Sequence, residues 1–171
     1  MHNDHTPFRT LKLSFFGGEP FLQFEAIKEL TDFASDFCKN NSKYFVLDFT
    51  TNANLIKQNH LLKISQYPCA FQITLDGNKK QHNKIKFTKD RNIDTYQLAI
   101  NNIKKILDTI SNSFVAIRIN FDSYTLNSFD DILEDIKDLD RKRVKIILKR
   151  IWQVNDKDIE NNSSFGFRIS S

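Results

Sequence analysis

The sequence has few of the residues that mark a metal centre, a disulfide framework or a membrane segment. Its 171 residues include two cysteines, Cys38 and Cys69, which are far apart and form no Cys-x-x-Cys pair. This excludes a disulfide framework and a self-contained zinc or iron–sulfur motif. No apolar run approaches the ~20 residues that cross a bilayer, and the first residues lack a signal-peptide apolar segment. We therefore expect a cytoplasmic protein with no membrane partner.

The charge pattern also gives no indication of a nucleic-acid interface. The formal net charge of +4 comes from lysines scattered among aspartates and glutamates, with no basic block interleaved with aromatic residues. A nucleic-acid interface needs such clustering on one face, so we expect no nucleic-acid partner. Hydrophobic residues make up 40% and charged residues 27% of the chain, which suits one globular domain.

Glycine is scarce, with four copies, and two of them are adjacent at Gly17 and Gly18. The buried-strand pattern of Leu11–Phe16 stops at this pair, and Glu19, a proline and an amphipathic pattern follow. Two glycines at the carboxyl end of a strand bring bare backbone close to a polar ligand without an intervening side chain.

Apolar runs and helical periodicities alternate along the rest of the chain. We predict strands at 11–16, 44–50, 69–75, 114–121 and 144–152. Helices are predicted at 24–40 and 57–65, and two more begin after caps at Asp94 or Thr95 and at Ser128. The first helix is expected to turn Ile27, Leu30, Ala34 and Phe37 inward, and the last Ile132, Leu133, Ile136 and Leu139. Residues 78–92 are interpreted as a polar loop.

Five strands with four intervening helices indicate an α/β fold with a parallel sheet, since helical crossovers join parallel strands. Two architectures fit: an open doubly wound sheet, and an incomplete (βα)6 partial TIM barrel. We expect a flexible segment at 1–10, the core at 11–152 and a polar tail at 153–171.

Both architectures bind ligands at the carboxyl ends of their strands. Polar groups gather at those predicted ends: Gly17, Gly18, Glu19, Asn52, Thr74, Asp76, Arg118 and Asn120. Polar turns follow strands in many proteins, so any one of these residues can be a turn residue. As a set they indicate a pocket, and Arg118 and Asn120 share one face of their strand. Arg118 can bind a carboxylate through two parallel hydrogen bonds, or form a salt bridge with Glu19 or Asp76.

Four short blocks stand in order along the chain. They are Gly-Gly-Glu-Pro at 17–20, Thr-Asn-Ala at 51–53, Thr-Leu-Asp-Gly at 74–77 followed by His82, and Arg-Ile-Asn at 118–120. The first resembles the Gly-Gly-Glu-Pro signature of the radical S-adenosylmethionine (SAM) superfamily. Together the four blocks resemble its branch of sulfatase-maturase-like and peptide-maturing enzymes with a SPASM extension.

The resemblance implies a partial barrel in which a [4Fe–4S] cluster cleaves SAM to a radical that abstracts hydrogen from a peptide or protein substrate. By this likeness Gly17, Gly18 and Glu19 would receive the amino group of SAM. Thr74 would lie near its ribose or carboxylate, and Arg118 would pair with the carboxylate. No catalytic residue and no metal ligand is assigned.

The chain departs from this family at the cluster. The family's Cys-x3-Cys-x2-Cys motif lies upstream of Gly-Gly-Glu-Pro, and residues 1–16 contain no cysteine. Ala53, Thr74 and Asn83 replace the family's glycine, serine and aspartate. We therefore expect a central fragment that is inactive alone, with a companion chain as one source of the missing strand and cysteines.

Two other functions stay open. The segment can be a peptide-binding or subunit-binding module, with 11–16 as a free edge strand. Alternatively, the lysine-rich segment at 79–91 serves an enzyme that acts on a phosphorylated substrate, although no glycine-rich phosphate loop is present.

Overall fold

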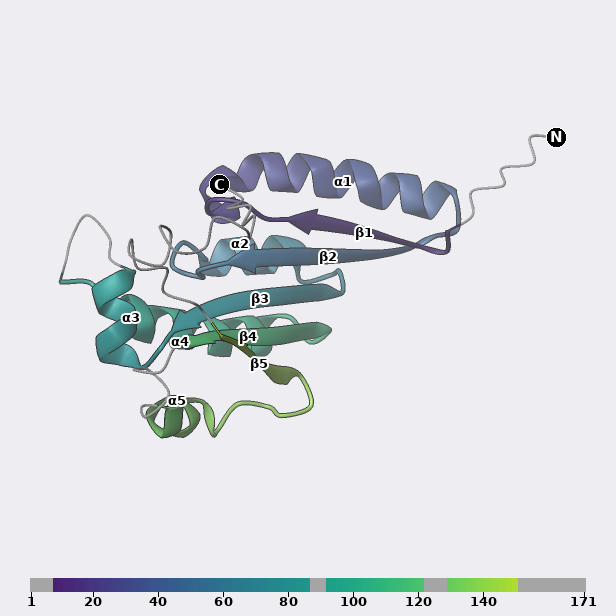
Figure 1. The fold of residues 1–171 in the computed structure, drawn as a ribbon. Helices are drawn as coiled ribbons and strands as arrows, with labels where there is room; N and C mark the ends of the chain where they lie inside the picture. The colour runs from purple at the N-terminus through teal and green to yellow at the C-terminus, as the bar shows by residue number, and fades with distance from the viewer. Residues whose placement is uncertain (1–7, 87–91, 122–128, 151–171) are drawn as a thin grey trace, which may run out of the picture.

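The computed structural model describes residues 8–86, 92–121 and 129–150, which form five parallel strands and the helices between them (Figure 1). The elements are β1 (Thr10–Phe15), the 3-10 turn η1 (Pro20–Gln23), α1 (Phe24–Asn40), β2 (Tyr44–Thr51), α2 (Gln58–Ile64), β3 (Cys69–Asp76), α3 (Lys79–Ile85), α4 (Thr95–Thr109), β4 (Ser113–Phe121), α5 (Phe129–Ile136) and β5 (Val144–Arg150).

The strands lie in the sheet in the same order as in the sequence, β1-β2-β3-β4-β5, and every neighbouring pair is parallel. A doubly wound sheet reverses its strand order at a switch point, whereas a (βα) barrel adds each strand beside the last. The partial-barrel prediction is therefore confirmed, and the doubly wound alternative is wrong.

The helices pack on one side of the sheet, where alternate strand residues form the core. Leu47, Phe49, Phe71, Ile73 and Ile117 are among those buried there, together with residues of α1, α2, α4 and α5. Right-handed crossovers between strands in sequential order place every helix on the same face. The opposite face carries Thr74, Arg118 and Asn120. We call it the inner face, because it lies inside the curve of the barrel.

Helix α1 is turned by about one residue position from the predicted orientation. Its buried positions include Phe24, Ile27, Ala34 and Cys38, whereas Leu30 is 52% exposed. Phe37, also predicted to point inward, is exposed as well. The helix has two adjacent apolar stripes, and periodicity alone does not decide which of them the sheet covers.

The predicted loop after β3 contains a short helix, α3, so that prediction is wrong over Lys79–Ile85. The Asn78 side chain accepts from the Gln81 N–H at 3.2 Å, and the Gln81 side chain accepts from the Asn78 N–H at 3.0 Å. This reciprocal capping box starts the helix although its residues are almost all polar.

Asn83 of α3 joins this helix to the start of α4. Its Oδ1 accepts from the Tyr96 N–H and the Thr95 hydroxyl, both at 2.9 Å, and its Nδ2 donates to Asp94 at 2.8 Å. An asparagine supplies the acceptor and the donor that this position needs. Burial raises the pKa of Asp94, but hydrogen bonds from Lys79, Asn83 and the Gln97 N–H outweigh it and lower the pKa to about 2.

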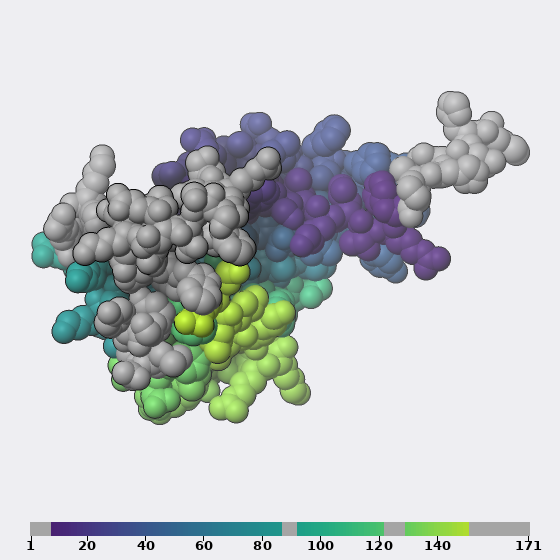
Figure 2. Space-filling view, in the orientation of Figure 1, coloured from purple at the N-terminus to yellow at the C-terminus, as the bar shows by residue number. Residues whose placement is uncertain are grey.

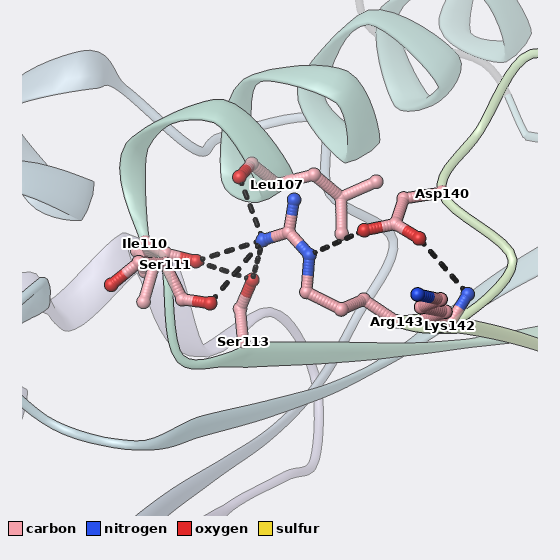
Figure 3. Close-up of polar contacts among 7 residues, drawn as sticks. All are labelled: Leu107, Ile110, Ser111, Ser113, Asp140, Lys142 and Arg143. Carbon is pink, nitrogen blue, oxygen red and sulfur yellow. Dashed lines mark hydrogen bonds and ion pairs between the residues drawn. The ribbon is translucent and has the colours of Figure 1, made fainter.

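Arg143, just before β5, links the end of α4 to the loop before β5 at the amino-terminal ends of the strands (Figure 3). Its Nη1 donates to the carbonyl oxygens of Leu107 at 2.8 Å and Ile110 at 3.2 Å, and its Nε donates to Asp140 at 2.9 Å. Leu107 lies in the last turn of α4 and Ile110 is its C-cap, so these carbonyls have no intrahelical donor. Arg143 thus stabilises the amino-terminal end of the barrel, away from the predicted site.

The remaining predictions fall partly outside the described residues. These are the flexible segment at 1–10, of which only 8–10 are described, the cap at Ser128, the end of the last strand at 151–152 and the tail at 153–171. Within the described ranges, none of the helices is long and apolar enough to cross a bilayer.

Candidate functional site

Gly17 and Gly18 form the turn that follows β1. Their φ angles are 90° and 56°, in the left-handed region where side-chain-bearing residues are strained. A Cβ built on either residue meets no atom within 4 Å. Their backbone conformation therefore requires glycine, and the space beside them is open to a ligand.

The Glu19 carboxylate fastens this turn to the end of β2. Its Oε1 accepts from the Thr51 hydroxyl at 2.7 Å and the Phe21 N–H at 3.3 Å, and its Oε2 accepts from the Asn52 N–H at 3.0 Å. A carboxylate that receives these donors is already occupied by the protein. Glu19 thus positions the Gly17–Gly18 backbone, and its side chain serves the fold.

The turn after β2 is held by its own side chains. Thr51 Oγ1 accepts from the Ala53 N–H, and Asn52 Oδ1 accepts from the Asn54 N–H, both at 2.9 Å. Ala53 has a φ of 63°, a conformation in which glycine is the usual residue. The left-handed backbone here accounts for the glycine of the resembling Thr-Asn-Gly turn, and Ala53 adopts it at a cost in backbone strain.

On β3 and β4, four of the predicted residues lie together on the inner face. In the strand register Thr74 lies beside Arg118, and Asp76 lies beside Asn120. Arg118 Nε donates to Asn120 Oδ1 at 3.1 Å, and Asn120 Nδ2 donates to Asp76 Oδ1 at 2.7 Å. The alternative of a direct salt bridge from Arg118 to Glu19 or Asp76 is not seen in the described residues, because Asn120 bridges Arg118 to Asp76.

This bridge leaves the terminal nitrogens of Arg118 available. The contacts described for Arg118 use its Nε only, and its side chain is only partly buried. A guanidinium fixed through Nε presents its two terminal nitrogens as a flat fork that suits a carboxylate. Asn120 therefore orients Arg118 and does not neutralise it.

His82 of α3 fixes the backbone of Asp76. The Asp76 N–H donates to His82 Nδ1 at 3.1 Å, and the His82 side chain is 0% exposed. Burial lowers the pKa of His82, so the ring is neutral, with Nδ1 as acceptor and the proton on Nε2. Gly77, between them in the sequence, has a φ of 80°, and a Cβ there would clash with the Gln81 side chain.

The sequence indicates His82 only as part of a motif, without a role at the site, and it does not single out Lys86. Lys86 Nζ lies 3.8 Å from Asp76 Oδ2, so this lysine completes the charge balance of the rim. The capping-box residues Asn78 and Gln81 are the signal in the sequence that reveals α3.

All eight predicted residues lie at the carboxyl ends of β1, β2, β3 and β4, four neighbouring strands. They form two hydrogen-bonded groups, Glu19 with Asn52, and Arg118 with Asn120 and Asp76. Gly17 and Gly18 directly precede Glu19 in the chain and so lie beside the first group. Thr74 lies beside Arg118 of the second group in the strand register. Such a rim, with exposed backbone at one side and a cation at the other, suits a ligand that carries an ammonium and a carboxylate.

The described residues do not fit an iron–sulfur cluster. They contain no group of three histidine, cysteine or acidic side chains that can hold a metal. Cys38 lies near the end of α1 and Cys69 at the start of β3, both buried and at the end of the sheet opposite the rim. Burial raises the pKa of Cys69 to about 12, so its thiol stays protonated at neutral pH.

The chain is similar in structure to several solved proteins. Native anSMEcpe with bound AdoMet and Kp18Cys peptide matches with a TM-score of 0.66 and 20% identity, over 82% of this chain and 38% of that one. Native anSMEcpe with bound AdoMet alone matches with a TM-score of 0.65 and 20% identity, over 82% of this chain and 38% of that one.

No protein-family model and no curated protein matches the sequence. This chain spans less than two fifths of the length of the anSMEcpe chains that it matches. At this identity the likeness concerns the architecture. The chain has the parallel, sequentially ordered partial-barrel fold of the anSMEcpe structures.

Proposed function

We propose that this chain is the SAM-binding core of a radical SAM maturase that acts on a peptide or protein. The observation that carries the proposal is the Arg118 fork, fixed by Asn120 at the same end of the sheet as the Gly17–Gly18 backbone. The anSMEcpe structures of the same fold contain AdoMet, and one contains the Kp18Cys peptide, which supports both parts of the proposal.

In this proposal the rim binds the amino-acid end of SAM. The backbone carbonyls of Gly17 and Gly18 accept from its ammonium, the Arg118 fork binds its carboxylate, and Thr74 contacts its ribose or carboxylate. Bound SAM supplies a 5′-deoxyadenosyl group as the source of a hydrogen-abstracting radical. A [4Fe–4S] cluster does not fit the described residues, so its cysteines come from outside them.

The test compares SAM with methylthioadenosine, which lacks the amino-acid end, by isothermal titration. SAM binds the wild-type chain more tightly than methylthioadenosine, and Arg118→Gln removes most of that difference. Losing a charged hydrogen-bond pair costs about 1.5–3 kcal/mol, or roughly 10- to 150-fold in affinity. Arg141→Gln, an exposed position before β5, is the matched control. Equal affinity for both ligands, or an unchanged Arg118→Gln variant, contradicts the proposal.

A second candidate function is docking of a companion chain at the β1 edge, and the surface of α1 favours it. Phe16 is 79% and Phe33 75% exposed, and Leu22, Leu30 and Phe37 are also exposed along this flank. In the described residues β1 pairs with β2 only, so its other edge can accept a parallel strand. The occupant in this proposal is a strand–helix segment that carries the three cluster cysteines.

This candidate is tested by co-expression with a polypeptide that carries Cys-x3-Cys-x2-Cys. Light scattering after gel filtration is expected to show a one-to-one complex that binds iron, and Phe33→Glu is expected to prevent it. Lys39→Gln, at the exposed end of the same helix, serves as the control. A chain that stays a monodisperse monomer, with or without Phe33→Glu, counts against a companion.

A further inference from the structure

The inner face of the sheet carries polar and charged side chains on all five strands. Two small residues, Ala70 on β3 and Ala116 on β4, also lie on this face. The charged side chains around them come from β1 to β5 and are Lys12, Asp48, Asp76, Arg118, Lys145 and Lys149. Lys145 lies beside Ala116 in the register, and Lys149 beside Asn120.

Both acids on this face already have partners. Asp48 binds Lys12 at 2.9 Å, and Asp76 receives Asn120 at 2.7 Å with Lys86 at 3.8 Å. By contrast, Lys145 and Lys149 are exposed and make no ion pair with a described residue. The inner face of β5 therefore carries uncompensated positive charge next to Arg118. Figure 2 shows part of the surface of β5, in yellow-green.

The spacing of these lysines matches one kind of ligand. Lys145 and Lys149 are four residues apart on one strand, which places their Cα atoms ~13 Å apart. Ile147 lies between them on the same face, beside Arg118. In an extended peptide, residues i and i+4 are separated by the same ~13 Å and also point to one side. A peptide with acids at i and i+4 and an apolar residue between them fits this row.

We infer that the inner face of β5 binds an extended, acidic segment of the peptide substrate, with carboxylates on Lys145 and Lys149 and an apolar side chain on Ile147. This inference rests on the proposed function for the presence of a peptide. It adds the substrate class, because Arg118 is reserved for the carboxylate of SAM and the two lysines stay free for the substrate.

The test uses fluorescently labelled peptides of one composition and fluorescence anisotropy. One peptide has two glutamates at i and i+4, a second has them at i and i+3 so that they point to opposite sides, and a third has glutamines instead. The i,i+4 peptide is expected to bind best and to weaken with added salt. Lys145→Gln and Lys149→Gln are each expected to weaken it about two- to fivefold, the range of exposed ion pairs.

The double variant Lys39→Gln, Lys104→Gln is the matched control for the double variant Lys145→Gln, Lys149→Gln, since its two lysines are exposed on the helix side and both double variants lower the net charge equally. Equal binding of the three peptides overturns the inference, and so does an equal effect of the control variant. A single-stranded oligonucleotide that binds more tightly than every peptide overturns it too. SAM titrated into Lys145→Gln, Lys149→Gln is expected to bind as in the wild type. If the wild-type chain does not bind SAM, the proposed function is refuted, whereas the comparison of the three peptides still decides whether β5 binds an acidic segment.

Discussion

Replacing Glu19 by glutamine tests whether this side chain joins the first two strand ends. The carboxylate receives the Thr51 hydroxyl and the N–H groups of Phe21 and Asn52. In Glu19→Gln one oxygen becomes an NH2 group, which cannot accept from a backbone N–H in either orientation. At least one N–H then loses its acceptor, and the remaining bonds lose the help of the negative charge.

Hydrogen bonds to charged groups contribute about 1.5–3 kcal/mol, so we expect Glu19→Gln to lower the free energy of unfolding by about 2 kcal/mol. For a chain of this size that corresponds to a fall of about 4–8 °C in melting temperature. Urea unfolding followed by circular dichroism measures the first value, and calorimetry the second. Glu29→Gln, an exposed change on α1, is expected to stay within about 0.5 kcal/mol.

A double-mutant cycle with Thr51→Val separates the shared hydrogen bond from general damage. If Glu19 and Thr51 act as one unit, the double variant is less destabilised than the sum of the single variants by at least ~0.5 kcal/mol. Simple additivity, or a Glu19→Gln variant as stable as Glu29→Gln, would refute the fastening role. Glu19 would then be free to contact a ligand directly.

Three further changes test the parts that support the rim. Arg143→Ala removes the donors to the last turn of α4 and is expected to cost about 2–3 kcal/mol in urea unfolding, with SAM affinity unchanged. Asn83→Asp places a second carboxylate 2.8 Å from Asp94 and is expected to cost about 1–3 kcal/mol at pH 7, whereas Asn83→Ser costs less. The lowered pKa of Asp94 stabilises the fold above pH ~4, and this contribution is lost as the pH falls towards 2. The gap in urea midpoint between wild type and Asp94→Asn should therefore narrow from pH 5 to pH 2.5.

The sequence contains enough information to predict the sheet, because each strand is an apolar run bounded by turn residues. β2, β3 and β4 lie within a residue of their predicted bounds, and Asp94 caps α4 as predicted. The helix surfaces were harder to assign. Leu30 and Phe37 share a period with Ile27, but tertiary packing selects the neighbouring stripe, which includes the polar Thr31.

The site was predicted as a set of strand ends, and these residues do lie at one end of the sheet. The hydrogen bonds within it were not predictable, because they depend on the register between strands distant in sequence. Asn120 bridges Arg118 to Asp76 only because β3 and β4 pair with Asp76 beside Asn120. Likewise, the reach of Glu19 to Asn52 depends on the φ angles of Gly17 and Gly18. Lys145 was not predicted as a site residue, because only the strand register shows that it lies on the inner face of the sheet.

A crystal structure of the chain soaked with SAM is the most direct test of the proposed site. The SAM carboxylate is expected within hydrogen-bond distance of the terminal nitrogens of Arg118, with its ammonium against the backbone carbonyls of Gly17 and Gly18. SAM bound elsewhere on the chain, or no bound SAM at a saturating concentration, would contradict the assignment of this rim to SAM.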